Sequence, residues 1–175
     1  MSQRYVITGA PGTGKTAIIN ALKERGYCGI DENSREIIAE QIKNKGEILP
    51  WKNQIAFENL ISSKRAKQYA RAPKDEICFF DRSTIDCIAY LKANNLETSA
   101  EILEVIKNCK FNSNVFYTPI WGEIYTNDSE RKESVESAII IENFLLSTYQ
   151  YFGYTLIEIP KLTIEERVDF ILSKI

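Results

Sequence analysis

The sequence contains no histidine among its 175 residues. This absence excludes Ser-His-Asp and Cys-His catalysis and the zinc sites that depend on histidine. The four cysteines include no Cys-x-x-Cys pair, so neither a zinc ribbon nor a redox motif is indicated. Any chemistry is therefore left to carboxylates, lysine, arginine and a metal ion that prefers oxygen ligands.

A strong net charge and long hydrophobic runs are also lacking. The 22 basic and 24 acidic residues leave a net charge of -2, so we expect neither nucleic acid nor a membrane surface as a partner. No segment approaches the roughly 18 continuous apolar residues of a membrane span, and no signal-peptide core follows Met1. We therefore expect a cytoplasmic protein. Its length predicts one domain, residues 1–175, and the sequence indicates no particular oligomeric state.

Short apolar runs alternate with helical patterns along the chain. We expect strands at residues 5–8, 27–30, 76–80, 114–118 and 154–159, with helical segments between and after them. The run at 76–80 is uninterrupted and ends at Asp81, as expected of a central strand that is buried on both faces of a parallel sheet. The alternation predicts a three-layer α/β fold, with a parallel sheet between helices.

Several helix ends also carry recognisable signals. Gly46 is expected to end the second helix in a left-handed conformation. Residues 98–101 (Thr-Ser-Ala-Glu) and 163–166 (Thr-Ile-Glu-Glu) each fit a capping box.

Residues 9–16 match the pattern G-x-x-x-x-G-K-[ST] in full. The expected nucleotide-binding residues are Gly9, Ala10, Pro11, Gly12, Thr13, Gly14, Lys15 and Thr16. The glycines let backbone N–H groups turn toward phosphate oxygens, and the following helix adds the positive end of its dipole. Lys15 would neutralise the β and γ phosphates, and Thr16 would place its hydroxyl on Mg²⁺. Between a strand and a helix, the pattern predicts a phosphate-binding loop for a nucleoside triphosphate rather than an ordinary glycine-rich turn.

Asp81 ends the apolar strand, at the position where such proteins place the carboxylate that holds Mg²⁺. A turn or helix-capping aspartate is the other interpretation. The next residue is Arg82, whereas hydrolytic ATPases of the motor and helicase type usually need a glutamate there to activate water. This difference argues against a dedicated hydrolase. Residues 44–47 (Asn-Lys-Gly-Glu) differ from a guanine-reading Asn-Lys-x-Asp and precede the Asp81 strand, which favours ATP over GTP.

The run Phe80-Asp81-Arg82-Ser83 resembles the Asp-Arg or Glu-Arg-Ser motif of deoxynucleoside kinases and thymidylate kinases. Over nearly its full length the chain also resembles the small bacterial AAA-type predicted ATPases related to the kinase domain of nicotinamide riboside kinase. The further matching elements are Glu32-x-x-Arg35, Leu49-Pro50-Trp51, Asp128-x-x-Arg131 and Gly153-Tyr154. The resemblance implies a P-loop NTPase whose five strands have the order 2-3-1-4-5, with the first strand beside the Asp81 strand.

Asp31 and Glu32 follow the second strand and should reach the same edge of the sheet as residues 9–16. The resemblance makes Glu32 a candidate general base, although both acids would also favour the start of the next helix through its dipole. Arg35 and Arg82 are candidates for holding an acceptor, or else form structural salt bridges.

Aromatic residues, a charged run and a late loop complete the candidate site. Trp51 and Phe57 fall where a stacking surface would be useful, but a core position is the competing interpretation. Related kinases carry a mobile lid near residues 127–136, so Arg131 is a candidate for contacting the transferred phosphoryl group, or else lies on an exposed helix face. By the same analogy the adenine would lie against the loop formed by Pro160, Lys161 and Leu162.

The leading hypothesis is a small-molecule, nucleoside-like kinase that transfers the γ-phosphate of Mg-ATP to a hydroxyl. Its expected catalytic residues are Lys15, Glu32, Asp81, Arg82 and Arg131, with Thr16 and Asp81 as the metal site. The alternative is a regulatory NTPase or slow ATPase that acts through a protein partner. A binding module without catalysis is disfavoured by the intact lysine, threonine and aspartate.

Overall fold

The computed structural model describes residues 3–121 and 135–175. Its centre is a parallel sheet in the order β2-β3-β1-β4-β5, which confirms the predicted three-layer α/β fold and the strand order that the resemblance implied. The strands are β1 (Arg4–Thr8), β2 (Cys28–Ile30), β3 (Cys78–Asp81), β4 (Asn114–Tyr117) and β5 (Thr155–Glu158).

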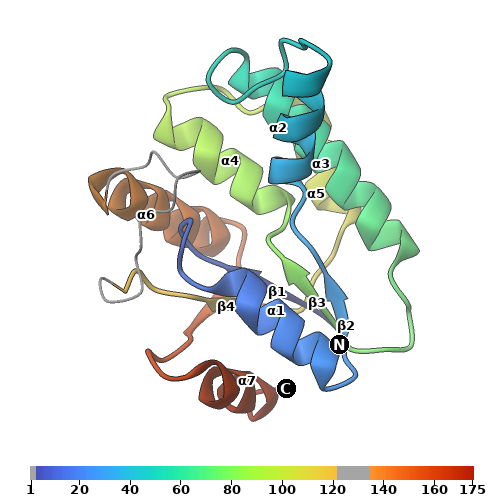
Figure 1. Ribbon diagram of the computed structural model, residues 1–175, viewed down its shortest axis with the longest axis vertical. Helices are drawn as coiled ribbons and strands as arrows, with labels where there is room; N and C mark the ends of the chain where they lie inside the picture. The colour runs from blue at the N-terminus through green and yellow to red at the C-terminus, as the bar shows by residue number, and fades with distance from the viewer. Residues whose placement is uncertain (1–2, 122–134) are drawn as a thin grey trace.

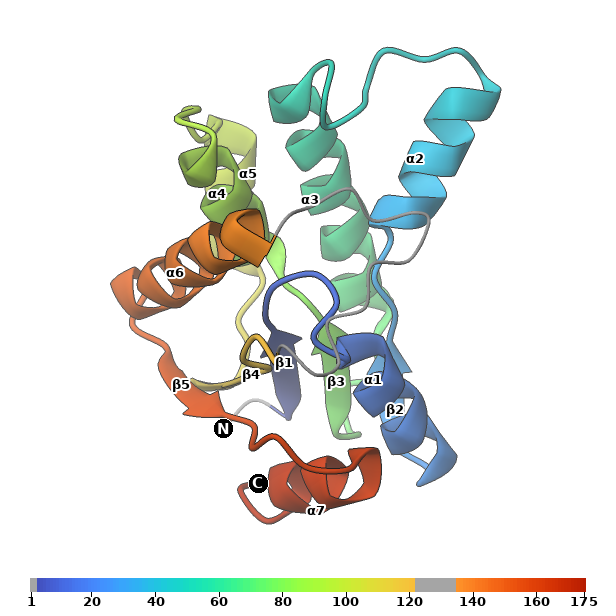
Figure 2. The same ribbon diagram turned by 60° about the vertical axis from the view of Figure 1, so that its left-hand side comes forward.

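Helices cover both faces of this sheet (Figure 1). They are α1 (Lys15–Glu24), α2 (Ser34–Lys43), α3 (Gln54–Arg71), α4 (Thr84–Ala93), α5 (Ala100–Asn108), α6 (Val135–Tyr151) and α7 (Ile164–Leu172). Figure 2 shows α1 and α7 on one side of the strands and α3 to α6 on the other. None of the helices within the described ranges is long and apolar enough to cross a membrane.

The two faces of the sheet have separate apolar cores because successive strand residues point in opposite directions. In β1, Val6 packs into the core formed with α3 to α6, whereas its neighbour Ile7 packs with Ile18 of α1 and Val168 of α7. All four side chains are fully buried. Burial of each contributes about 1.5–3 kcal/mol, so the alternation in β1 fixes which helices lie on which face.

Two helix ends differ from the sequence-based expectation. Lys45, not Gly46, has the positive φ of 53° after α2, where the backbone of Asn44 closes the last turn. Helix α5 begins one residue later than the pattern at 98–101 predicted: Ser99 is its N-cap and accepts a hydrogen bond from the Ile102 N–H, and no capping box forms. The capping box at 163–166 is confirmed at the start of α7.

The carboxyl ends of the strands meet at one edge of the sheet, as they must when all strands are parallel. Residues 9–16 follow β1 there, Asp81 ends β3 and is followed by Arg82, and Glu32 follows β2. Segments that are far apart in the sequence therefore share one rim, where ligands of open α/β sheets bind.

Candidate functional site

The loop at residues 9–16, predicted to bind phosphate, has glycine at three positions with positive φ. Gly9, Gly12 and Gly14 have φ values of 144°, 80° and 87°, which side-chain-bearing residues rarely adopt. At Gly9 a Cβ atom would also lie 2.5 Å from the Thr118 carbonyl oxygen. The loop therefore needs glycine both for its dihedral angles and for its close approach to the end of β4.

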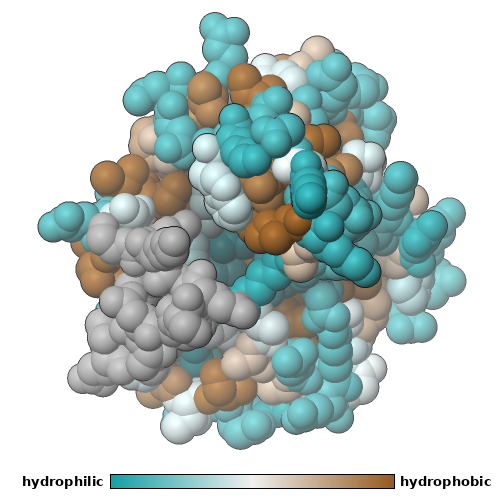
Figure 3. All heavy atoms as spheres, turned by 45° about the horizontal axis from the view of Figure 1, so that its top comes forward, coloured by the Kyte–Doolittle hydropathy of each residue, from teal (hydrophilic) through white to brown (hydrophobic). Residues whose placement is uncertain are grey.

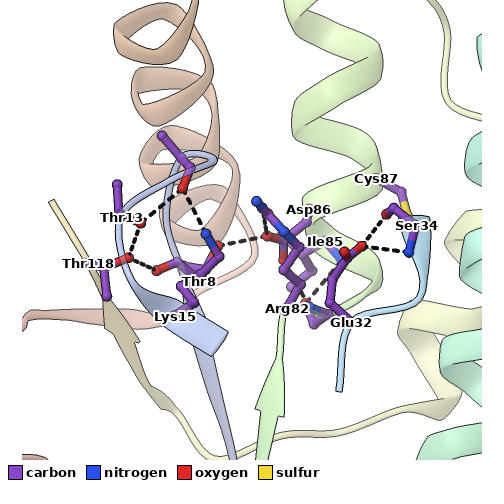
Figure 4. Close-up of polar contacts among 12 residues, drawn as sticks. Thr8, Thr13, Lys15, Glu32, Ser34, Arg82, Ile85, Asp86, Cys87 and Thr118 are labelled. Carbon is purple, nitrogen blue, oxygen red and sulfur yellow. Dashed lines mark hydrogen bonds and ion pairs between the residues drawn. The ribbon is translucent and has the colours of Figure 1, made fainter. Parts of the chain in front are cut away.

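Hydrogen bonds within the loop and to the residue after β4 hold this loop in shape. The Thr13 hydroxyl donates to the Ala10 carbonyl at 2.9 Å and shares a 2.5 Å hydrogen bond with the Thr118 hydroxyl. The backbone N–H of Thr118 in turn donates to the Thr8 carbonyl at 2.9 Å. Figure 4 shows these side chains grouped beside the loop. The cradle is thus pre-formed by protein contacts alone.

Helix α1 begins at the end of this cradle with its N-terminal N–H groups available. Its N-cap is Gly14, which has no side chain to cap them, and its first turn carries no acidic residue. Such an N-terminus attracts anions through the helix dipole and its unpaired donors.

Lys15 lies in the cradle and is 6% exposed. Its Nζ donates to the Ala10 carbonyl at 2.7 Å. Burial and, to a lesser extent, the Arg82 guanidinium lower the pKa of Lys15 to about 7. An anion placed beside Lys15 would stabilise its charged form, so this position suits a negatively charged group.

Thr16 and Asp81 form a pair suited to a hard cation. The Thr16 hydroxyl donates to Asp81 Oδ2 at 3.1 Å, while Asp81 Oδ1 is buried and has no hydrogen-bond partner. Burial raises the pKa of Asp81. No group of three or more histidine, cysteine or acidic side chains in the described residues is placed so that it could hold a metal ion by itself. One hydroxyl and one carboxylate fit Mg²⁺, which keeps most of its ligands as water and phosphate oxygens.

Arg82, directly after β3, has an unusual backbone conformation. Its φ is 73°, and its N–H donates to the Ile7 carbonyl at 3.0 Å. The buried guanidinium donates to Asp86 Oδ1 at 3.0 Å and lies 5.5 Å from the centre of the Tyr90 ring. Burial opposes the charge, but Tyr90 and the surrounding carboxylates outweigh burial and raise the pKa of Arg82 well above its usual value. A strained residue so fixed is typical of a functional position.

Asp86, which the sequence reasoning missed, holds Arg82 in place (Figure 4). This fully buried carboxylate accepts hydrogen bonds from Thr8 Oγ1 at 2.7 Å, from the Ser83 N–H at 2.9 Å and from the Tyr149 hydroxyl at 2.5 Å, in addition to the bond from Arg82. Burial opposes its charged form, yet these donors and the nearby arginines outweigh it, and the pKa of Asp86 is lowered. The spacing Ser83-x-x-Asp86, a capping box at the start of α4, is the signal that could have identified it.

Glu32 lies on the other side of Arg82, in a partly buried position. Its Oε1 accepts hydrogen bonds from the backbone N–H of Ser34, at 3.0 Å, and from the Ser34 hydroxyl. Arg65 of α3, a second residue that the sequence reasoning missed, lies 3.6 Å from the same oxygen and donates to the Ser83 carbonyl at 2.6 Å. Burial opposes ionisation, but Arg65 and Arg82 prevail and lower the pKa of Glu32. The carboxylate is therefore ionised at neutral pH.

Other predicted residues do not join this cluster. Asp31 is exposed and forms an ion pair with Lys23 at 2.6 Å. Arg35 is exposed on α2, and Trp51 is 64% exposed on the connection between α2 and α3. The core position weighed for Phe57 is confirmed, because this side chain is 4% exposed and packs in the apolar core of α3 to α6.

The remaining predicted residues flank the site or lie beyond it. Pro160 and Leu162 form a turn after β5, closed by a hydrogen bond from the Leu162 N–H to the Pro160 carbonyl at 3.0 Å. Lys161 is exposed within that turn. Arg131 and most of the lid expected at 127–136 lie outside the described residues.

An open hollow of about 500 Å³ lies on the outer side of β2, where Glu32, Glu36, Gln68 and Arg71 contribute to its lining. None of its lining residues comes from the loop at 9–16 or from β3, and Glu32 is the residue that it shares with the cluster around Arg82. On the face drawn in Figure 3, the described surface is mainly hydrophilic, with small separate groups of hydrophobic side chains.

Comparisons with known proteins agree with this architecture. A family model described as AAA domain matches residues 4–167. No curated protein sequence gives a significant match.

Several solved structures have the same fold at low sequence identity. Deoxyadenosine kinase from M. mycoides, with dCMP and dCDP bound, is 18% identical with a TM-score of 0.70, and the alignment covers 98% of this chain and 97% of that one. NadR in complex with NR is 17% identical with a TM-score of 0.74, over 98% of this chain and 51% of that one. Thymidylate kinase from Ehrlichia chaffeensis is 12% identical with a TM-score of 0.65, over 99% and 98% of the two chains. Similarity at this level of identity establishes the fold.

Proposed function

Because the chain belongs to the AAA-domain family, whose model it matches over residues 4–167, and has the fold of P-loop kinases, we propose that it is an ATP-dependent phosphotransferase. It binds Mg-ATP on residues 9–16 and transfers the γ-phosphate to a hydroxyl of a small, nucleoside-like acceptor. The observation that carries the proposal is the pair of ionised groups, Glu32 and Arg82, fixed on the rim beside Lys15.

The phosphate side of the reaction rests on the cradle. Backbone N–H groups and Lys15 hold the β and γ phosphates, and the charge on Lys15 is restored when the anion binds. Thr16 and Asp81 would hold Mg²⁺, which when bound neutralises phosphate charge. Binding thus places the negative phosphates beside the buried Lys15 and the positive Mg²⁺ beside the buried Asp81.

The acceptor side rests on Glu32. Its ionised carboxylate orients the acceptor hydroxyl and takes its proton as the oxygen–phosphorus bond forms and ADP leaves. The lowered pKa makes Glu32 a weak base. That suffices for a loose phosphoryl-transfer transition state, in which orientation and charge stabilisation supply most of the catalysis.

Arg82 supplies positive charge between the two sides. Its guanidinium is held by Asp86 at 3.0 Å and keeps further N–H donors that can contact an oxygen of the transferred group. Since Arg82 stands where water-activating ATPases carry a glutamate, transfer to an acceptor is favoured over transfer to water.

The test is ADP release from Mg-ATP, alone and with a panel of nucleosides, nicotinamide riboside and nucleoside monophosphates, with Lys15→Ala as the blank. We expect one acceptor class to raise turnover at least about tenfold, as positioning of a reacting group allows. Glu32→Gln should lower kcat with that acceptor about 10²-fold while Mg-ATP affinity stays within about twofold.

Glu36→Gln is the matched control. Glu36 lies in the first turn of α2, close in sequence to Glu32, but it is exposed and its nearest cation, Lys64, is 3.6 Å away. This variant should keep the wild-type kcat. If no acceptor stimulates ADP release and Glu32→Gln leaves it unchanged, the kinase proposal is refuted. In that case the surviving function is a regulatory NTPase or slow ATPase that acts through a protein partner.

A further inference from the structure

Helix α7 reaches the phosphate-binding loop through one buried arginine. Arg167 is 2% exposed, and its Nη2 donates to the Thr13 carbonyl at 3.1 Å. Its Nη1 lies close enough to Gly14 that a Cβ atom there would be 2.9 Å away. A residue near the end of the chain is thus in direct contact with the turn that opens α1.

The charge of Arg167 has no carboxylate partner among residues 3–121 and 135–175. The acidic side chains nearest in sequence are used elsewhere: Glu165 and Asp169 pair with Arg25, at 2.8 and 2.5 Å, and Glu166 caps the first turn of α7. Its Nε is buried with no hydrogen-bond partner, and burial lowers the pKa of Arg167. Burying a charged guanidinium without a carboxylate partner costs free energy, so an ion pair does not explain why Arg167 is buried.

The orientation of one peptide group supplies that explanation. The bond between Thr13 and Gly14 is trans, so its carbonyl and its N–H point in opposite directions. Since Arg167 holds the carbonyl on the α7 side, the Gly14 N–H is turned to the other side of the loop, where the phosphates bind. A cation on the carbonyl oxygen also polarises the peptide and strengthens the N–H as a donor.

We propose that Arg167 is a positioning residue of the nucleotide site, which fixes the Thr13–Gly14 peptide with its N–H toward the phosphates and makes α7 part of that site. The bound phosphates would then also balance the positive charge of Arg167, which has no carboxylate partner in the described residues. Gly14 is required on this account for two reasons: its φ of 87° and the space that Arg167 occupies. The inference rests on the nucleotide-binding half of the proposed function and not on transfer to an acceptor.

The competing explanation is that Arg167 only attaches α7 to α1. Arg25 offers a matched control, because its exposed ion pairs with Glu165 and Asp169 also join α1 to α7 but do not touch residues 9–16. Arg25→Met should therefore leave nucleotide binding unchanged, whereas Arg167→Met, which keeps the length and apolar stem, should weaken it.

The experiment measures Mg-ATP and Mg-ADP affinity by calorimetry, with the melting temperature of the ligand-free protein, for wild type, Arg167→Met, Arg167→Lys and Arg25→Met. We expect Arg167→Met to lose about tenfold or more in affinity for both nucleotides, the cost of misaligning one phosphate donor, while its ligand-free melting temperature does not fall. Arg167→Lys should recover part of the affinity, since it restores a charged donor.

Wild-type affinity in Arg167→Met would overturn the inference, as would equal losses in Arg167→Met and Arg25→Met. If Arg167→Met does not fold, Arg167→Lys decides: a weaker affinity than wild type supports the inference, and an unchanged affinity with a lower melting temperature overturns it. Absence of Mg-ATP binding by the wild type would instead refute the nucleotide-binding proposal itself. Binding without any acceptor-stimulated turnover would refute only the kinase half.

Discussion

At the scale of single residues, the buried carboxylate of Asp86 fixes the position of Arg82. Four donors converge on its two oxygens, so an amide in its place would turn an N–H₂ group toward a donor and leave the Arg82 charge without its partner. We expect Asp86→Asn to lower the free energy of unfolding by about 3 kcal/mol, as for other buried ion pairs that lose one member.

Urea denaturation measures this loss, and Asp75→Asn is the control because Asp75 is exposed in the turn before β3. That variant should stay within about 0.5 kcal/mol of wild type. Equal stabilities of the two variants would show that the donors around Asp86 do not depend on its charge.

Gly9 makes a second prediction at this scale, because two separate constraints act on it. Its φ of 144° and its contact with Thr118 both exclude a side chain, whereas Gly26 has a φ of 87° with nothing within 4 Å of a Cβ atom. Gly26→Ala therefore reports the backbone cost alone, about 1–2 kcal/mol. Gly9→Ala should cost at least about 1 kcal/mol more in thermal denaturation and should abolish Mg-ATP binding. A Gly9→Ala protein that still binds nucleotide normally would contradict this account of the loop.

Some candidate site residues are marked by a pattern in the sequence around them, whereas others are identified only by contacts with distant segments. The place of residues 9–16 between β1 and α1 could be predicted because one contiguous pattern indicates a loop between a strand and a helix. The place of Asp81 could be predicted because it ends an apolar strand. Arg65 and Arg167 could not, since each acts through a carbonyl group of a segment that is distant in the sequence, Ser83 or Thr13. No periodicity or composition encodes such contacts.

At the scale of elements, the contact between α4 and α6 depends on a polar group as well as on apolar packing. Tyr149 of α6 is fully buried, and its hydroxyl donates to Asp86 and shares a 2.7 Å hydrogen bond with the Ser83 hydroxyl, both at the start of α4. We expect Tyr149→Phe to lower the free energy of unfolding by about 1.5–3 kcal/mol, because a hydrogen bond to a charged group is lost.

Tyr151→Phe, two residues further on α6, is the control for the same chemical change. Tyr151 is 77% exposed and its ring lies 5.2 Å from the Lys92 ammonium, a contact that phenylalanine retains. Its effect should be within about 0.5 kcal/mol. Because Tyr149 reaches Arg82 only through Asp86, the kcat of Tyr149→Phe should also fall while Mg-ATP affinity is kept. Loss of stability without a change in kcat would limit Tyr149 to a structural role.

Most elements could be predicted, and so could the start of α7, but two other helix ends could not. The strand at β3 could be assigned because its apolar run is uninterrupted, as expected of a strand in which every residue from Cys78 to Asp81 is buried. The end of α2 was misplaced because Lys45 takes the left-handed conformation that the glycine beside it would adopt more readily. The start of α5 moved by one residue because Ser99, not Thr98, also hydrogen-bonds to Asn59 of α3, at 2.6 Å. Tertiary contacts therefore decide between neighbouring caps of similar intrinsic preference.

At the scale of the whole molecule, the strand order follows from the resemblance rather than from the residues. Alternating strands and helices predict a parallel sheet, but several orders satisfy right-handed crossovers equally well. In the observed order β1 pairs with both β3 and β4, and its Val6 and Ile7 are buried on opposite faces. This arrangement also places the end of β1 between Asp81 and Thr118, so the fold and the site are fixed together.

The pH dependence of global stability should come from buried charges, since the net charge of -2 is small. Glu58 of α3 is 4% exposed, and burial raises its pKa to about 7 against the opposing effect of Arg65, Cys87, Gln54 and Arg82. Between the usual value of 4.5 and about 7 the folded state binds the extra proton, so stability is fully present below pH 4.5 and is lost as pH rises through 7.

Glu58→Gln keeps the shape of the protonated carboxyl group but cannot ionise, so its stability should not share this loss. We expect the free energy of unfolding of Glu58→Gln, relative to wild type, to increase by roughly 2–3 kcal/mol between pH 5 and pH 8, measured by urea denaturation at each pH. The same substitution at the exposed Glu40 should leave the difference from wild type nearly constant, because that carboxylate stays in water in both states. A Glu58→Gln profile parallel to wild type would mean that Glu58 remains ionised in the folded protein, with its charge balanced by Arg65.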